Sequence, residues 1–195
     1  MSDFKVPDSG MPEESYWNQL MDIPAIVDWL ELERVKQGIV EIGCGYGSFT
    51  LPIAQQCSAP LIAFDIEPAM INLCQAKCAQ AQLDHVQFVE RDIIHSGSGL
   101  ATASMDLVLI FNLLHGPHNL TLIREAQRIL SHEGRIAIIH WRGDIETPRG
   151  PALDTRPDLD SIQQLTADLP LELAQLSPAL GPYHWGLHLL NVLDE

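Results

Sequence analysis

The stretch Ile39-Val40-Glu41-Ile42-Gly43-Cys44-Gly45-Tyr46-Gly47 decides the fold that we predict for this chain. Apolar residues and one acid run directly into three glycines at alternate positions, which is typical of a buried parallel strand that ends in a tight turn. Because glycine has no Cβ, the backbone of such a turn can approach a ligand closely. We therefore expect a cofactor to lie on the turn formed by residues 43–47.

The spacing of the glycines indicates the kind of cofactor. A dinucleotide-binding loop keeps its third glycine three residues after the second, so that a helix N-terminus can hold a pyrophosphate. Here Gly43, Gly45 and Gly47 alternate, and the carboxylate of Glu41 just upstream would repel a phosphate. An adenosine ligand that carries a positive charge and no phosphate fits this stretch better.

Two further acids end predicted strands. Asp65 closes the apolar run 61–65 and lies eighteen residues after Gly47, close to the offset of roughly 20 residues at which an acid binds ribose hydroxyls in nucleotide-binding folds. A carboxylate accepts two hydrogen bonds side by side, which matches a pair of vicinal hydroxyls. The alternative is that Asp65 caps the helix that begins at Pro68. Asp92, followed by Ile93, ends the strand predicted over 85–92.

Taken together, these residues resemble the class I S-adenosylmethionine-dependent methyltransferases. Residues 39–47 are similar to motif I of that family, 64–70 to its second motif and 105–111 to motif IV. In the segment 128–134, Ser131 and His132 replace the usual Lys-Pro of the family. The resemblance covers roughly 39–192. It implies one α/β domain with a doubly wound, mostly parallel sheet of seven strands, a Rossmann-like fold whose last strand is antiparallel.

The resemblance also implies roles for individual residues. Glu41 would lie near the amino-acid end of S-adenosyl-L-methionine, and Asp65 would hold the ribose. Asp92 would bond the adenine amino group while Ile93 packs on the ring. The full set of expected cofactor-binding residues is Tyr16, Trp17, Glu41, Gly43, Cys44, Gly45, Tyr46, Gly47, Asp65, Ile66, Asp92, Ile93 and Asn112.

Hydrophobic patterning predicts the remaining elements. Strands are expected over 39–42, 61–65, 85–92, 105–111, 135–141, 171–176 and 182–190, and helices over 13–20, 48–56, 68–80 and 160–168, with two more that begin after Asp22 and at Pro117. The link 177–182 is too short for a parallel return, which needs a dozen or more residues, so the last two strands must pair antiparallel.

The chain is divided into three predicted parts. Residues 1–12 mix Pro, Gly, Ser and acids without a period and are expected to form a flexible tail. Residues 13–36 are expected to form an N-terminal helical lid, and 37–195 the cofactor-binding methyltransferase domain. In the lid, Tyr16 and Trp17 either contact the cofactor or anchor the helix to the domain.

Charge and composition limit the class of substrate. The chain has 195 residues, and its 26 acidic residues against 11 Lys and Arg give a formal net charge of −15. Nucleic acid and anionic membrane surfaces are poor partners for such a surface, because binding to a phosphate backbone depends on Lys and Arg. A small-molecule acceptor is favoured. No targeting or membrane-spanning stretch is evident, so we expect a cytoplasmic protein.

The four cysteines predict neither a disulfide scaffold nor a paired metal site. Cys74 and Cys78 lie four residues apart on a predicted helix, where a metal or redox role is conceivable, but buried thiols are favoured. We expect no bound metal. The oligomeric state is left open.

Several residues are candidates for the acceptor side. His115 and His140 follow the predicted strands 105–111 and 135–141 at the cofactor edge and are the first candidates for a catalytic role. Structural histidines are the alternative. Further candidates are His118, Tyr183, His184 and the loop 142–159, with Arg142, Arg149 and Arg156. These arginines either hold an anionic acceptor or neutralise neighbouring acids.

Three functions are compatible with this sequence. The first is methyl transfer to a small molecule by in-line displacement. The second is a nicotinamide-dependent oxidoreductase, which would also use an acid at Asp65 but is opposed by the glycine spacing, by Glu41 and by the antiparallel end of the sheet. The third is a non-catalytic partner subunit that keeps the fold and binds the cofactor.

Overall fold

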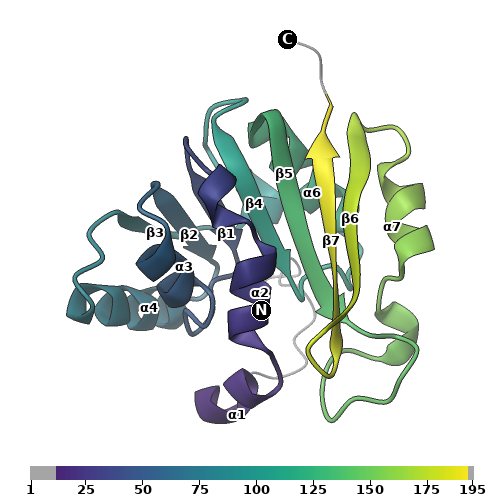
Figure 1. Ribbon diagram of the computed structural model, residues 1–195, viewed down its shortest axis with the longest axis horizontal. Helices are drawn as coiled ribbons and strands as arrows, with labels where there is room; N and C mark the ends of the chain where they lie inside the picture. The colour runs from purple at the N-terminus through teal and green to yellow at the C-terminus, as the bar shows by residue number, and fades with distance from the viewer. Residues whose placement is uncertain (1–11, 193–195) are drawn as a thin grey trace.

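A computed structural model of the chain describes residues 12–192 (Figure 1). The flexible tail predicted for 1–12 lies outside the described residues except for Pro12. In chain order the elements are α1 (Glu14–Gln19), α2 (Ile23–Trp29), η1 (Leu32–Arg34), β1 (Ile39–Ile42), α3 (Thr50–Gln56), β2 (Leu61–Asp65), α4 (Pro68–Gln80), β3 (Val86–Glu90), α5 (Ile93–Ser96), β4 (Met105–Phe111), α6 (Asn119–Ile129), β5 (Leu130–Trp141), η2 (Leu153–Thr155), α7 (Leu159–Thr166), β6 (Leu171–Leu180) and β7 (His184–Asn191).

One seven-stranded sheet organises the fold, in the order β3-β2-β1-β4-β5-β7-β6. Neighbouring strands from β3 to β5 are parallel, while β7 runs antiparallel to both β5 and β6. The predicted α/β sheet with an antiparallel last strand is therefore confirmed.

The two central strands, β1 and β4, are buried almost throughout, as expected for strands that are covered on both faces. Because successive side chains point to opposite faces, each strand contributes to two separate cores. Ile39 and Leu107 pack with the helices α2, α3 and α4, and Val40 and Val108 pack with α5, α6 and α7. Figure 1 shows α2 in front of the sheet and α6 behind it.

The site is positioned by a change of direction between β1 and β4. These strands are hydrogen-bonded neighbours, but β1 leads into α3 on one face of the sheet and β4 leads into α6 on the other. At such a switch point the loops at the carboxyl ends diverge and leave room for a ligand. In Figure 1 this edge is at the bottom of the sheet, beside α1.

Most predicted elements agree with the structure, and the differences lie at strand ends. β5 begins at Leu130, five residues before the predicted start at Arg135, because Leu130 pairs with Met105 before a bulge in the ladder. β6 continues to Leu180 through the segment predicted as a turn. A short helix, α5, lies between β3 and β4, where no helix was predicted.

Candidate cofactor and acceptor site

The glycine turn after β1 needs glycine for both conformation and space. Gly43, Gly45 and Gly47 all have positive φ angles, of 77°, 52° and 77°. A Cβ on Gly47 would lie 2.5 Å from Cys74 Sγ, and one on Gly43 would lie 3.1 Å from Leu113 Cδ1. The turn thus lies between α4 and the loop after β4, and a side chain at Gly43 or Gly47 would press on a neighbour.

The other two residues of the turn have their own partners. The N–H of Cys44 donates to Phe64 O at 2.9 Å, while its side chain is buried beside the thiol of Cys74. Tyr46 reaches outward, and its hydroxyl donates to Pro12 O at 2.7 Å. The backbone of the turn, rather than these side chains, is left to approach a ligand.

Asp65 is built into the same turn from the neighbouring strand. Its Oδ2 accepts a hydrogen bond from Gly45 N at 2.8 Å, and its Oδ1 accepts one from Glu67 N at 2.9 Å. The residue is 9% exposed. A carboxylate has about four lone-pair sites, so the two backbone bonds fix its orientation and leave acceptor capacity for two hydroxyls. Ile66 follows at the bend beside it and is half-buried.

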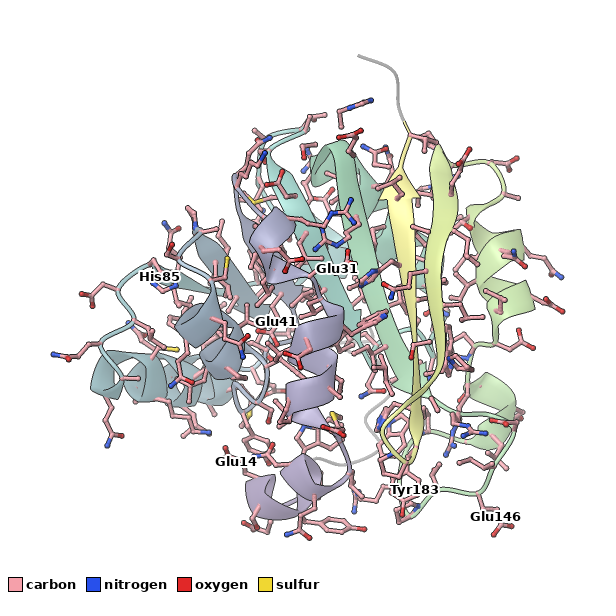
Figure 2. All side chains as sticks on the ribbon, in the orientation of Figure 1. Glu14, Glu31, Glu41, His85, Glu146 and Tyr183 are labelled. Carbon is pink, nitrogen blue, oxygen red and sulfur yellow. The ribbon has the colours of Figure 1, made fainter. Side chains whose placement is uncertain are left out.

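Glu41 points into the core on the side of α3. It is 2% exposed, and Thr50 Oγ1 donates to its carboxyl group. Figure 2 shows Glu41 in the interior of the molecule. Burial raises the pKa of Glu41 well above its usual value, and this outweighs the lowering effect of the Thr50 hydrogen bond. Its expected place near the amino-acid end of the cofactor stays a prediction.

The raised pKa predicts how Glu41 affects stability. A folded-state pKa above the unfolded one gives a stabilising contribution that is complete below pH ~4.5 and is lost as the pH rises through the folded pKa. We expect wild-type protein to lose up to about 1.4 kcal/mol of unfolding free energy per pH unit in this window relative to Glu41→Gln. Urea unfolding between pH 4.5 and 8 measures this. Glu172→Gln, at an exposed position on β6, is the control, and parallel pH profiles for wild type and Glu41→Gln would contradict the assignment.

Helix α1 lies against the glycine turn. Lys77 Nζ forms an ion pair with Glu14 and donates to Tyr46 O at 2.7 Å, and Ser48 Oγ donates to Asn18 Oδ1 at 2.6 Å. The polar contacts link α1 to the turn and to α4. They are compatible with a lid over the cofactor, and this role stays a prediction.

The two aromatic residues of α1 differ in their surroundings. The ring of Trp17 meets Trp141 edge to face, with 6.1 Å between centroids, so it anchors α1 to the end of β5. Tyr16 is 38% exposed. The cofactor contacts predicted for both residues stay predictions.

Asp92 and Ile93 both have structural roles. Asp92 is the N-cap of α5 and accepts a hydrogen bond from His95 N at 3.0 Å through Oδ1. Ile93 is buried against the core on the α6 side. Their predicted contacts with adenine remain untested, and the Asp92 carboxylate keeps a second oxygen for such a bond.

The two histidines predicted at the acceptor side are brought together. His140 Nε2 lies 3.4 Å from His115 Nδ1, and His140 Nδ1 lies 3.4 Å from the carbonyl oxygen of Trp141; both are long hydrogen bonds. His140 is 0% exposed, and burial, together with His115, lowers its pKa to about 3, so it is neutral at pH 7.

The partners of His140 assign the tautomers of the pair. A carbonyl oxygen can only accept, so Nδ1 of the neutral His140 carries its single proton, and its Nε2 accepts from His115 Nδ1–H. A neutral His115 that donates through Nδ1 carries its lone pair on Nε2. His115 is half-buried, whereas His140 is fully buried.

The loop after β5 is held together by its own arginines. Arg142 pairs with Asp144 at 2.7 Å, which favours charge neutralisation for this residue. Arg156 donates to Pro151 O and Arg142 O, and its Cζ lies 5.9 Å from the ring centroid of Trp141. Figure 2 shows Tyr183 and Glu146 at the same lower edge of the molecule as Glu14. His184 is buried against Trp141, with 4.2 Å between ring centroids.

Asn112 is one of the residues of the site whose side chain has no hydrogen-bond partner. It follows β4 directly, with a φ of 57°, and its N–H donates to Ile139 O at 2.7 Å. Neither the Oδ1 nor the Nδ2 atom has a hydrogen-bond partner, and both atoms are buried. The sequence predicted that Asn112 lies at the carboxyl edge of β4, but it did not predict that its side-chain amide has no partner.

Within residues 12–192, no group of three or more His, Cys, Asp or Glu side chains is arranged to hold a metal ion. Across the same residues, the helices are too short or too polar to serve as a membrane span.

Comparison with known proteins decides the family. A family model described as "Methyltransferase domain" matches residues 39–134, which hold the glycine turn, Asp65, Asp92 and Asn112. The chain belongs to the class I S-adenosylmethionine-dependent methyltransferases. It is therefore an enzyme of the methyltransferase class with S-adenosylmethionine as cofactor, and the predicted family is confirmed.

Solved structures support the fold of this methyltransferase over nearly its whole length. A SAM-dependent methyltransferase from Aquifex aeolicus is 17% identical, with a TM-score of 0.78 over 92% of this chain and 94% of that chain. Magnesium protoporphyrin IX methyltransferase from Synechocystis PCC 6803, solved with bound SAM, is 17% identical, with a TM-score of 0.69 over 96% of this chain and 88% of the other.

A curated relative matches a shorter segment. The 23S rRNA (uracil(1939)-C(5))-methyltransferase RlmD from Pasteurella multocida (strain Pm70) is 32% identical over 76 residues. These residues are 39% of this chain and 17% of the relative. The match thus covers only a small part of that protein.

The residues of this methyltransferase fit the cofactor of its family. Asp65 retains acceptor capacity toward a ribose, and the three glycines of the turn 43–47 present backbone at the switch point. When bound, S-adenosylmethionine supplies an activated methyl group on sulfur. The protein has to position the acceptor and exclude water.

Proposed function

We propose that this methyltransferase transfers the methyl group of S-adenosylmethionine to a small-molecule acceptor. The observation that carries the proposal is the Asp65 carboxylate, oriented by Gly45 N at the switch point and retaining acceptor capacity for a ribose. The net charge of −15 supports a small acceptor over a polynucleotide, because an RNA backbone would be repelled. The relative that acts on 23S rRNA matches only 39% of this chain.

We further propose His115 as the general base and His140 as the residue that orients it. With the tautomers assigned above, His115 in its neutral form has a lone pair on Nε2. This lone pair can take the proton of an acceptor that has to be deprotonated in order to react. His140 is fully buried, and its proposed role is to orient His115 through the hydrogen bond between them. The four cysteines of the described chain are all free, which supports the cytoplasm as the compartment.

A methyl-release assay tests the proposed function. Radiolabelled S-adenosylmethionine is incubated with catechol, phenol, ethanolamine, 2-mercaptoethanol, selenite and an rRNA fragment, and transfer to at least one small molecule but not to RNA is expected. His115→Ala should lower kcat about 10²-fold or more with little change in cofactor affinity. His132→Ala, at an exposed position on β5, should have no effect.

Three outcomes of this assay would contradict the proposal. Transfer to RNA alone would overturn the class of acceptor. Cofactor binding without transfer to any compound would favour the non-catalytic partner subunit. Unchanged turnover in His115→Ala would remove that residue as the base.

A further inference from the structure

Three buried thiols lie where the glycine turn meets α4. Cys44 belongs to the turn and is 4% exposed, while Cys74 and Cys78 on α4 are 0% and 1% exposed. All three are free. Free cysteine commonly fills a core like a small apolar side chain, so burial alone assigns no role to these residues. Cys44 and Cys74 differ from ordinary core thiols because they meet each other between the turn and the helix.

The turn brings Cys44 next to Cys74. Gly47 N donates to Cys44 O at 2.9 Å, which closes a four-residue turn and holds its two ends together. Cys74 lies against the Gly47 end, since a Cβ on Gly47 would be 2.5 Å from Cys74 Sγ. The thiols of Cys44 and Cys74 share a hydrogen bond, and both side chains pack in the core cluster on the α3 and α4 side of the sheet.

Cys74 is the more acidic thiol of this pair. The hydrogen bond with Cys44, supported by Thr50 and by the positive charge of Lys77, lowers the pKa of Cys74 to about 7 against the opposing effect of burial. The same hydrogen bond and burial raise the pKa of Cys44. Because the thiolate is the form that reacts with an oxidant, Cys74 is the thiol that would react first, and Cys44 is the neighbour that could resolve the product.

Cys78 is less suited to pair with Cys74, although the sequence spacing drew attention to these two residues. They lie four positions apart on α4, where Cβ atoms are about 5–6 Å from each other. A disulfide needs its Cβ atoms about 3.5–4.5 Å apart, so a bridge between Cys74 and Cys78 would distort the helix. Cys44 and Cys74 lie on different elements and are not held apart in this way.

We propose that Cys44 and Cys74 form a redox-sensitive switch, in which a disulfide between them lowers the affinity of the glycine turn for S-adenosylmethionine. The oxidant is hydrogen peroxide or an organic hydroperoxide. With hydrogen peroxide, the sulfur of Cys74 attacks one oxygen, the O–O bond breaks, and a sulfenic acid and one water are formed. The sulfur of Cys44 then displaces the sulfenic hydroxyl as a second water. The peroxide gains two electrons, each sulfur loses one, and the two thiol protons end in the two waters.

The bridge acts on the cofactor through the backbone of the turn. A covalent bond draws the two sulfurs closer than their hydrogen bond does, so Cys44 must move toward α4. The glycines beside it, with their positive φ angles, are the residues best able to shift with it. Asp65 Oδ2 is bonded to Gly45 N at 2.8 Å, so a shift of the turn also disturbs the carboxylate suited to the ribose. Disulfides in a reducing compartment are usually transient and redox-sensing, which agrees with a reversible switch.

Calorimetry on the oxidised and the reduced protein tests the switch. Wild-type protein is treated with hydrogen peroxide or with dithiothreitol, the reagent is removed, and S-adenosylhomocysteine is titrated into each sample. We expect oxidation to raise the Kd about tenfold or more, and dithiothreitol to restore it. Mass spectrometry of a non-reduced digest should show the peptides of Cys44 and Cys74 joined with the loss of two hydrogens. Saturating S-adenosylhomocysteine during the peroxide treatment should slow this cross-link, because the ligand and the bridge require different positions of the turn.

Cysteine variants identify the pair. For each variant the Kd after oxidation is divided by its own Kd after reduction, so that a direct effect of the substitution on binding cancels. Cys44→Ala and Cys74→Ala should each bring this ratio close to one, and either variant suffices if the other does not fold. Cys57→Ala is the matched control, because Cys57 is more exposed and its sulfur lies 3.9 Å from Leu32 O at the far end of α3. Cys57→Ala and Cys78→Ala should keep the ratio of wild type.

Several results would overturn the inference. These are the absence of a cross-link at any peroxide concentration that leaves the protein folded by circular dichroism, a link that involves Cys78 or Cys57 instead, and a Cys44–Cys74 link that leaves the Kd unchanged. Loss of the folded circular dichroism signal together with formation of the link would also count against it, because the effect would then be unfolding. All readouts concern cofactor binding, so failure to find a small-molecule acceptor would contradict the proposed function and leave this result intact.

Discussion

Asp65→Ala is expected to raise the Kd for S-adenosylmethionine by about 10²-fold or more. Two hydrogen bonds from ribose hydroxyls to a charged acceptor contribute about 3–6 kcal/mol together, and alanine removes both. The substitution also frees Gly45 N, which the carboxylate holds at 2.8 Å, so the turn loses one of its hydrogen bonds to β2. Calorimetric titration of the purified variant measures the change.

Asp106 offers a matched control for this substitution. It is also a strand-terminal acid that holds backbone amides, those of Lys36 and Gln37, both at 2.7 Å, but it lies at the opposite end of the sheet. Asp106→Ala should lower the melting temperature and leave the Kd unchanged. A folded Asp65→Ala protein with wild-type affinity would show that Asp65 does not hold the ribose.

Gly47→Ala is expected to have the largest effect on folding. Its Cβ would lie 2.5 Å from Cys74 Sγ, and the φ of 77° is unfavourable for alanine. Overpacking and backbone strain together should cost about 3 kcal/mol of unfolding free energy. Because the turn must shift, cofactor affinity should fall as well. Urea unfolding and calorimetry measure the two effects.

A double substitution separates the two causes. In Gly47→Ala combined with Cys74→Ala, the overlap with sulfur is removed and the backbone strain remains, so part of the lost stability should return. Gly143→Ala is the control, since its Cβ would meet no atom closer than 3.7 Å. Full stability of the single Gly47→Ala variant would contradict the packing described for the turn.

Local sequence features were sufficient to predict the central part of the fold. β2, α4 and β4 begin and end where their apolar runs and the proline at the start of α4 indicate. Each of these signals lies within the element itself. The antiparallel pairing of β6 and β7 followed from the short link between them.

The strand ends depend on distant partners and were not predictable from local sequence. The segment from Ser131 to Gly134 has the composition of a turn, yet it extends β5 because Leu130 pairs with Met105. Pro178 suggested the end of β6, but an edge strand tolerates a proline that has no ladder bond to donate.

In the candidate site, too, some features could be predicted from local sequence and others depend on distant partners. Asp65 and the glycine turn could be found from spacing along the chain, and the carboxyl edges of β4 and β5 brought His115 and His140 to one place as expected. The contact of Gly47 with Cys74 and the burial of Glu41 against Thr50 arise from packing between elements. The unpartnered amide of Asn112 depends on how the loop after β4 turns back, which the sequence pattern does not specify.

The most direct test of this account is calorimetric titration of the wild-type protein with S-adenosylmethionine, S-adenosylhomocysteine and NAD in parallel. The account predicts saturable binding of one molecule of either adenosyl compound per chain and no heat with NAD. Binding of NAD with no response to either adenosyl compound would contradict the cofactor assignment and the site built around Asp65.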